Sequence, residues 1–158
     1  MVTFRPAKNL AKAAHFTLSN MQPYYEQHSV DWDEAKIEKM TQELVNLDIL
    51  FEEKLVGVVR LSFDIEECWL RDLQVDQRYQ NRGIGSIAIA EAERLAKEHC
   101  SHILKLKVFK TSPAVHLYKR HGFDVSCDSR NQSLMIRHFL VTTFKMTTSK
   151  MSSLSDNI

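Results

Sequence analysis

The fold of this chain is decided by the stretch Leu73-Gln74-Val75-Asp76-Gln77-Arg78-Tyr79-Gln80-Asn81-Arg82-Gly83-Ile84-Gly85-Ser86. An extended segment ends at Val75, a polar loop follows, and Gly83 and Gly85 open a long helical pattern. Glycines allow a backbone to approach a ligand closely, and the unpaired N–H groups of a first helical turn attract anions. The stretch therefore predicts a strand, a loop and a helix that bind a pyrophosphate. Plain packing of the helix against the strand is the alternative explanation of the glycines.

Two other phosphate-binding loops do not fit this stretch. A P-loop requires a lysine after its last glycine, and Ser86 follows Gly85 instead. The dinucleotide fingerprint requires a third glycine, where this chain has Ala88, and an acid after the next strand, which here is rich in lysine.

The rest of the chain has the composition of one globular domain. It has 158 residues, of which 44% are hydrophobic and 26% charged, with a net charge of +1. This length suits one hydrophobic core, and no apolar run is long enough for a transmembrane helix. We expect a single domain over residues 1–140 and a disordered tail over 141–158, because 8 of those 18 residues are Ser or Thr.

Hydrophobic periodicity and turn residues predict a mixed sheet with helices, an α/β or α+β domain. Lys8–Leu18 has helical spacing, and Ser19–Val30 with its Pro23 reads as a loop or a broken helix. Asp31 is the expected cap of the second helix. The expected strands are Val2–Arg5, Leu47–Phe51, Leu55–Phe63, Glu67–Val75, Ile103–Phe109, Phe123–Cys127 and Leu134–Leu140, and the later helices are Ile84–Cys100 and Pro113–His121.

The neutral total conceals two charged regions. Residues 20–48 hold seven acids against two bases, and residues 101–123 hold five bases and no acid. Ordinary solvated faces explain this pattern, and so do two ligands of opposite charge. The near-neutral total gives no reason to expect nucleic acid as a partner. Three widely spaced cysteines favour a reducing cytoplasm, and without a ligand cluster we expect no metal.

A second motif lies downstream. Ser112 and Pro113 begin a short helix in which Ala114, Leu117 and Tyr118 share a face, and Gly122-Phe123 follows it. Taken alone, a tyrosine in this position is more often a core residue whose hydroxyl is hydrated.

Together the two motifs resemble those of the GCN5-related N-acetyltransferases. The family's cofactor loop, Q/R-x-x-G-x-G/A, stands here as Gln80-Asn81-Arg82-Gly83-Ile84-Gly85. Its later segment, N-x-x-A-x-x-L-Y-x-x-x-G-F, is matched except that Thr111 replaces the asparagine. The resemblance implies a mixed, mainly antiparallel sheet of six or seven strands flanked by about four helices.

The resemblance also implies that acetyl-coenzyme A is the cosubstrate and gives roles to individual residues. The Tyr118 hydroxyl would protonate the leaving thiolate, as the similar pKa values of a phenol and a thiol (~10 and ~8.5) allow. Thr111 would contact the cofactor through a hydroxyl in place of a carboxamide. The backbone of Leu73, Gln74 and Val75 would pair with the pantetheine arm, and the N–H groups of Gln80, Asn81, Arg82, Gly83, Ile84, Gly85 and Ser86 would hold the pyrophosphate.

An amine acceptor must lose a proton before it attacks, because a lysine-like amine has a pKa of ~10.4. Relatives with a catalytic glutamate often carry it six residues before Val75, where this chain has Trp69. Asp72 is the first candidate base and Glu67 the second, and a water chain without a dedicated base is equally compatible with the sequence.

The expected activity is direct transfer of an acetyl group to a primary amine of a small molecule or a protein. The resemblance implies that the first two helices, their connection and the late strands form the acceptor pocket. Aromatic rings and acids in that connection suit a cationic amine, and the alternative is that Tyr25 and Trp32 only hold the loop in place. The alternative is a non-catalytic acetyl-coenzyme A sensor of the same fold. The resemblance also implies that the late strands can pair in a homodimer. The candidate acceptor-binding residues are Tyr24, Tyr25, Glu26 and Trp32.

Overall fold

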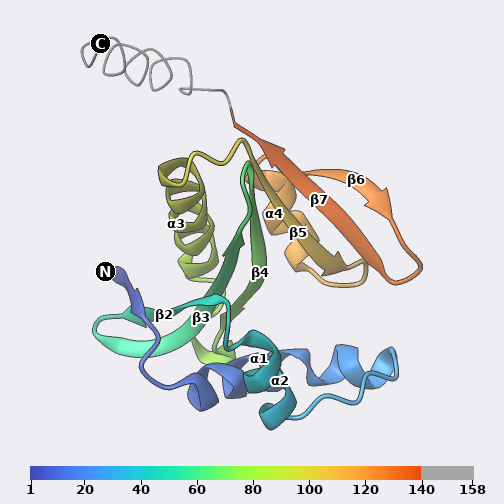
Figure 1. Ribbon diagram of the computed structural model, residues 1–158. Coiled ribbons are helices and arrows are strands. Elements are labelled where there is room, and N and C mark those ends of the chain that lie inside the picture. Colours follow the sequence, from blue (N-terminus) through green and yellow to red (C-terminus); the bar gives the residue numbers. More distant parts are fainter. Residues whose placement is uncertain (140–158) are drawn as a thin grey trace.

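The computed structural model describes residues 1–139, in which seven strands form one mixed sheet (Figure 1). The strand order is β1-β2-β3-β4-β5-β7-β6, and within the described chain β4 and β5 are the parallel pair. The mainly antiparallel sheet with four helices confirms the expected fold class. The elements are β1 Val2–Pro6, α1 Leu10–Gln27, α2 Glu34–Thr41, β2 Val45–Phe51, β3 Lys54–Phe63, β4 Glu67–Val75, the 3-10 helix η1 Gln77–Tyr79, α3 Ile84–Glu98, β5 Ile103–Phe109, α4 Ala114–Arg120, β6 Asp124–Asp128 and β7 Gln132–His138.

The helices cover the two faces of the sheet in pairs. On one face, α3 and α4 meet closely, since a Cβ on Gly85 would lie 3.2 Å from Leu117. Their apolar residues, with Leu104 and Leu106 of β5, form the main core. On the opposite face, α1 packs on β3 and β4, and a smaller core of Ala14, Tyr25 and Ile37 joins α1 to α2. Figure 1 shows α1 and α2 together below the sheet.

Strands β4 and β5 run together over part of their length and then separate. Their register covers Glu67–Trp69 opposite Ile103–Lys105. Beyond that point β5 continues beside β7, and β4 continues beside β3. Figure 1 shows the two strands close at the top of the sheet and widely separated at the bottom. One edge of β4 from residue 70 onward therefore has no neighbouring strand in the described structure.

Two expectations about the first helices are wrong. The first helix runs to Gln27 without a loop, because Pro23 lies on its exposed side, where the carbonyl group that loses a partner can bond to water. The second helix is capped by Asp33, whose Oδ1 accepts the Lys36 N–H at 2.8 Å, whereas Asp31 pairs with the Lys36 side chain.

The strand boundaries were predicted more closely. Residues 67–75 and 103–109 form strands with the expected bounds, and no other strand end differs from its expected position by more than two residues. The expected tail over 141–158 and the end of the last strand at Leu140 lie outside the described residues. Among the described helices, none combines the length and the hydropathy needed to cross a bilayer.

Candidate active site

The free edge of β4 exposes backbone groups where the sheet opens. The Asp76 N–H donates to the Val56 carbonyl of β3 at 2.7 Å. Because alternate residues of a strand direct their backbone groups to opposite sides, those of Leu73 and Val75 point away from β3. They face the gap that separates β4 from β5. An extended chain lying in this gap could pair with them as an added strand.

A β-bulge decides which way the β4 side chains point. Arg60 is paired with Asp72 and the next residue, Leu61, with Leu70, so Arg71 is the extra residue. Consequently Asp72 and Gln74 face α1, while Val75 faces the core on the α3 side. Asp72 and Val75 thus lie on opposite faces, as simple alternation between them requires.

The loop after β4 leads directly into the first turn of α3. The Gln80 side chain donates to the Val75 carbonyl at 2.9 Å and folds the loop back against the strand. Gly83 has a φ of +81°, which favours glycine, and there it begins α3. The first N–H bonded inside the helix is that of Ile87, so Ile84, Gly85 and Ser86 direct free N–H groups outward. This geometry suits an anion.

The two arginines of the loop have different surroundings. Arg78 pairs with Asp76 at 2.9 Å, and its hydrogen bonds hold the pKa of that carboxyl below its usual range. Arg82 is exposed, with its guanidinium 5.4 Å from the Tyr79 ring centre. Of these two arginines, Arg82 is therefore the one without a carboxylate partner among residues 1–139.

Tyr118 of α4 lies in the main core. The residue is 8% exposed, and its ring meets that of Phe123 edge-on. Burial is the main cause that raises the pKa of the Tyr118 phenol, and the negative charge of Asp72 raises it further. The phenol therefore remains protonated at neutral pH, the form that a proton donor needs. Thr111 lies exposed in the turn before α4.

A buried ion pair lies beneath α1. The guanidinium of Arg60, 0% exposed, pairs with Asp72 Oδ2 and donates to Asn46 Oδ1 at 2.7 Å. Thr17 accepts from Arg60 and donates to the same Asp72 oxygen, each at 2.6 Å. Gln74 donates to the other Asp72 oxygen at 2.7 Å. Asp72 is thus held by three donors.

The second candidate base is also paired. Glu67 Oε1 lies 2.8 Å from Lys105 Nζ. Trp69, which occupies the position of a family glutamate, lies between them and the bulge, and three cationic side chains approach its ring. Both carboxylates predicted as candidate bases are therefore paired with a cationic side chain, Asp72 with Arg60 and Glu67 with Lys105.

The predicted acceptor residues lie mainly on a helix. Tyr24, Tyr25 and Glu26 belong to the last turns of α1, not to the connection between helices, because α1 passes Pro23. Tyr24 stacks on Phe109 of β5, and Tyr25 is buried against Trp32. Tyr24 therefore reaches the sheet near the opening, whereas Tyr25 contributes to the smaller core.

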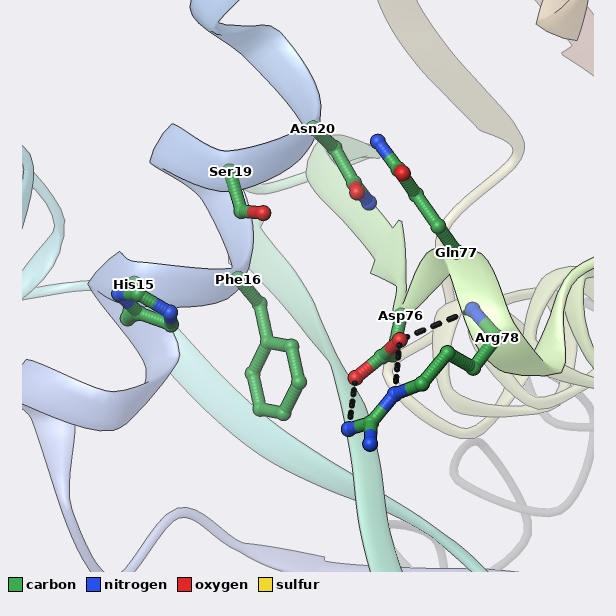
Figure 2. Close-up of a pocket in the computed structure, with 7 residues that line it drawn as sticks. All are labelled: His15, Phe16, Ser19, Asn20, Asp76, Gln77 and Arg78. Atoms are coloured by element: carbon green, nitrogen blue, oxygen red, sulfur yellow. Dashed lines mark hydrogen bonds and ion pairs between the residues drawn. The ribbon is translucent and has the colours of Figure 1, made fainter.

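A polar groove separates α1 from the loop after β4 (Figure 2). It has a volume of about 290 Å³ and was not predicted. Asn20 of its wall donates to the Val75 carbonyl at 2.8 Å. The contacts that α1 makes with β3 and β4 had signals in the sequence. Thr17 and Asn20 are polar residues on the buried side of α1, and Arg60 is a charged residue inside an apolar strand. The groove is lined by His15, Phe16, Ser19, Asn20, Asp76, Gln77 and Arg78. Within residues 1–139, no three potential metal-binding side chains gather.

The comparisons with known proteins agree with this geometry. The sequence profile described as the Acetyltransferase (GNAT) family matches residues 10–123. The chain belongs to this acetyltransferase family. No curated protein sequence matches it.

Solved structures of the GNAT family share the fold at low identity. The PaiA N-acetyltransferase of Thermoplasma acidophilum, in complex with coenzyme A, is 17% identical over 88% of this chain and 99% of its own, with a TM-score of 0.71. A GNAT family acetyltransferase from Elizabethkingia anophelis with acetyl-CoA bound is 14% identical over 87% of this chain and 98% of its own, with a TM-score of 0.64. The ribosomal-protein-S18-alanine N-acetyltransferase of Escherichia coli is 19% identical, over 86% and 91%, also at 0.64.

The buried ion pair generates a prediction about stability. Arg60→Met should lower the free energy of unfolding by about 3–5 kcal/mol, because it leaves a partly buried carboxylate without its cation. Adding Asp72→Asn removes that charge and should restore at least half of the loss. Urea denaturation measures both. Arg94→Met, which breaks exposed ion pairs, is the control and should cost less than about 1 kcal/mol. An Arg60→Met variant as stable as that control would contradict the prediction.

Proposed function

We propose that this GNAT protein is an N-acetyltransferase that moves the acetyl group of acetyl-coenzyme A directly to a primary amine. The observation that carries the proposal is the edge of β4 beyond residue 70, which has no neighbouring strand in the described structure, together with the buried Tyr118 phenol, which is close enough to Asp72 of that strand for the carboxylate charge to raise its pKa. The coenzyme A and acetyl-CoA bound in two structures of the same fold support this choice of cosubstrate.

The chain offers complementary groups for each part of the cofactor. The backbone of Leu73 and the N–H of Val75 would pair with the amide groups of the pantetheine arm, since the Val75 carbonyl already accepts from Asn20 and Gln80. The free N–H groups of Ile84, Gly85 and Ser86, with Arg82 beside them, would hold the pyrophosphate. An amide of the same strand would polarise the thioester carbonyl.

Tyr118 would act as the acid of the reaction. The neutral amine attacks the thioester carbonyl, the carbon–sulfur bond breaks, and the phenol gives its proton to the departing sulfur. The proton released by the product nitrogen then reaches solvent, from which the phenolate is reprotonated. Burial and the Asp72 charge raise the pKa of Tyr118, so the phenol is protonated before each turnover but is a weaker acid than a phenol in water. Its proton would therefore move to sulfur only as negative charge builds on the departing thiolate.

Water is the best candidate to accept the first proton from the amine. A proton arriving at Asp72 would have to displace Arg60, Thr17 or Gln74, and one arriving at Glu67 would compete with Lys105. Asp72 would instead act through its charge on Tyr118. Tyr24, Glu26 and Trp32 would surround the acceptor amine, and the widely spaced cysteines support a cytoplasmic setting.

Replacing the proposed acid separates chemistry from binding. Tyr118→Phe should lower kcat at least about 100-fold, because general acid catalysis contributes that much, while the Kd of acetyl-coenzyme A stays within threefold. Coenzyme A release across a panel of amines and calorimetric binding of the cofactor give the two quantities.

Tyr24→Phe is the matched control, since it removes a hydroxyl at the proposed acceptor side. It should alter the KM of the amine with little effect on kcat. Equal losses of kcat and cofactor affinity in Tyr118→Phe would contradict the acid role. Tight cofactor binding by the native protein, with no turnover of any amine, would instead favour the sensor.

The carboxylates give a second prediction. If water accepts the amine proton, Glu67→Gln should retain kcat/KM within about fivefold, whereas loss of a general base costs at least about 100-fold. Asp72→Asn should mainly lower the urea midpoint, because it leaves Arg60 buried without its partner. The pH profile of kcat/KM decides the point: a profile whose acidic limb disappears in either variant would identify that carboxylate as the base.

A further inference from the structure

Three cationic side chains surround the indole ring of Trp69. The Arg71 guanidinium carbon lies 4.5 Å from the ring centre, the Lys105 ammonium 5.6 Å and the Lys107 ammonium 6.0 Å. Like charges gathered this closely repel one another, and the ring offsets only part of that repulsion. The Trp69 cluster, defined as Trp69, Arg71, Lys105 and Lys107, is therefore a place where an added negative charge is stabilised.

The carboxylates around the cluster do not neutralise it. Glu67 pairs with Lys105, so the charges of Arg71 and Lys107 are the ones that still need a partner. Arg71 donates to the neutral Ser62 hydroxyl at 2.8 Å, and within residues 1–139 no acid forms an ion pair with Lys107. Asp124 of β6 and Lys105 of β5 are both paired with Ile136 of β7, so their backbones lie two strand spacings apart, at roughly 10 Å. The cluster thus keeps an excess of about two positive charges.

The cluster lies on the α1 side of the sheet. Leu104, Leu106 and Val108 of β5 point into the core with α3 and α4, so the alternating Lys105, Lys107 and Phe109 point to the other face. Phe109 stacks there against Tyr24 and against His28, at the end of α1. The helices that hold the proposed pyrophosphate loop and the proposed acid are on the far side. The cations are therefore better placed to meet the acceptor than the phosphates of the cofactor.

We infer that the acceptor is an amine whose own molecule carries a carboxylate, which the Trp69 cluster binds while the amine reaches the gap between β4 and β5. This inference rests on the proposed N-acetyltransferase function and names its substrate class. Trp69 would support the carbon chain of the acceptor, and Lys107 and Arg71 would pair with its carboxylate.

The spacing along β4 limits the length of this acceptor. Trp69 and Leu73 lie opposite Ser62 and Val59 of β3, which are three residues apart, so the bulge leaves roughly 10 Å between them along the strand, and the cationic side chains cover part of that distance. A carboxylate several bonds from the amine fits this span better than the one on the α-carbon of an amino acid. An ω-amino acid and an acidic peptide with a free N-terminus share this chemistry.

The test compares acceptors that differ only in charge. The first pair is 6-aminohexanoate and its amide, and the second is the peptide amide Ala-Ala-Asp-Ala and its Asn counterpart. In whichever pair resembles the natural acceptor, the compound that carries the carboxylate should have a kcat/KM roughly tenfold higher than its uncharged counterpart. This is the gain expected for one charge-assisted hydrogen bond. Lys107→Gln should remove most of this preference and leave the KM of acetyl-coenzyme A unchanged.

The matched control is Lys39→Gln, which makes the same change of charge on an exposed position of α2. It should keep the preference of the native protein. Equal rates for both members of each pair, or a preference that survives Lys107→Gln, would overturn the inference. A higher KM for acetyl-coenzyme A in Lys107→Gln would also overturn it, by assigning the cluster to the cofactor.

A binding measurement separates this inference from the proposed function. Protein labelled with fluorotryptophan gives a ¹⁹F signal for Trp69, assigned by its absence in Trp69→Phe. Hexanoate should shift this signal at lower concentration than hexanamide in the native protein but not in Lys107→Gln. This result would support the carboxylate site even if no amine were acetylated. Equal response to both compounds would refute the site even if acetylation occurs.

Discussion

The buried pair of Arg60 and Asp72 is the interaction on which the arrangement of this site depends. A guanidinium without solvent must find several acceptors, and here they come from β2, β4 and α1 through Asn46, Asp72 and Thr17. One side chain of β3 thereby ties the first helix to the strand that borders the gap. Asn20 adds a bond from the same helix to the Val75 carbonyl, so α1 and the free edge of β4 are positioned together.

The same pair shapes the chemistry available to the site. The bulge at Arg71 places Asp72 toward α1, where Arg60 and two other donors hold its oxygens. A carboxylate held in this way is poorly suited to exchange protons. Its charge nevertheless raises the pKa of the Tyr25 and Tyr118 phenols together with their burial. Asp72 thus connects the stability of α1 with the protonation of the proposed acid.

Sequence patterns predicted those parts of the fold that depend on local periodicity. Glu67–Val75 and Ile103–Phe109 alternate clearly, and Gly83 marks the start of α3 through its positive φ. The continuation of α1 past Pro23 was missed, because packing of Tyr25 against α2 decides it and not local propensity. Arg60 was missed for a related reason. An arginine within an apolar strand indicates a buried partner, but the sequence does not say which of the twenty acids provides it.

The charged regions of the sequence acquire a different meaning once folded. Four of the seven acids in the early region cap a helix or pair with a base: Asp33 caps α2, and Asp31, Glu34 and Asp48 pair with Lys36, His15 and Arg5. Few of them remain to attract a cation. Of the five late bases, Lys105 and Lys107 lie on the α1 face of β5, Lys119 and Arg120 belong to α4, and Lys110 lies in the turn after β5. A positive run along the chain therefore serves two surfaces of the molecule, and the one that faces α1 favours an acceptor with a negative group.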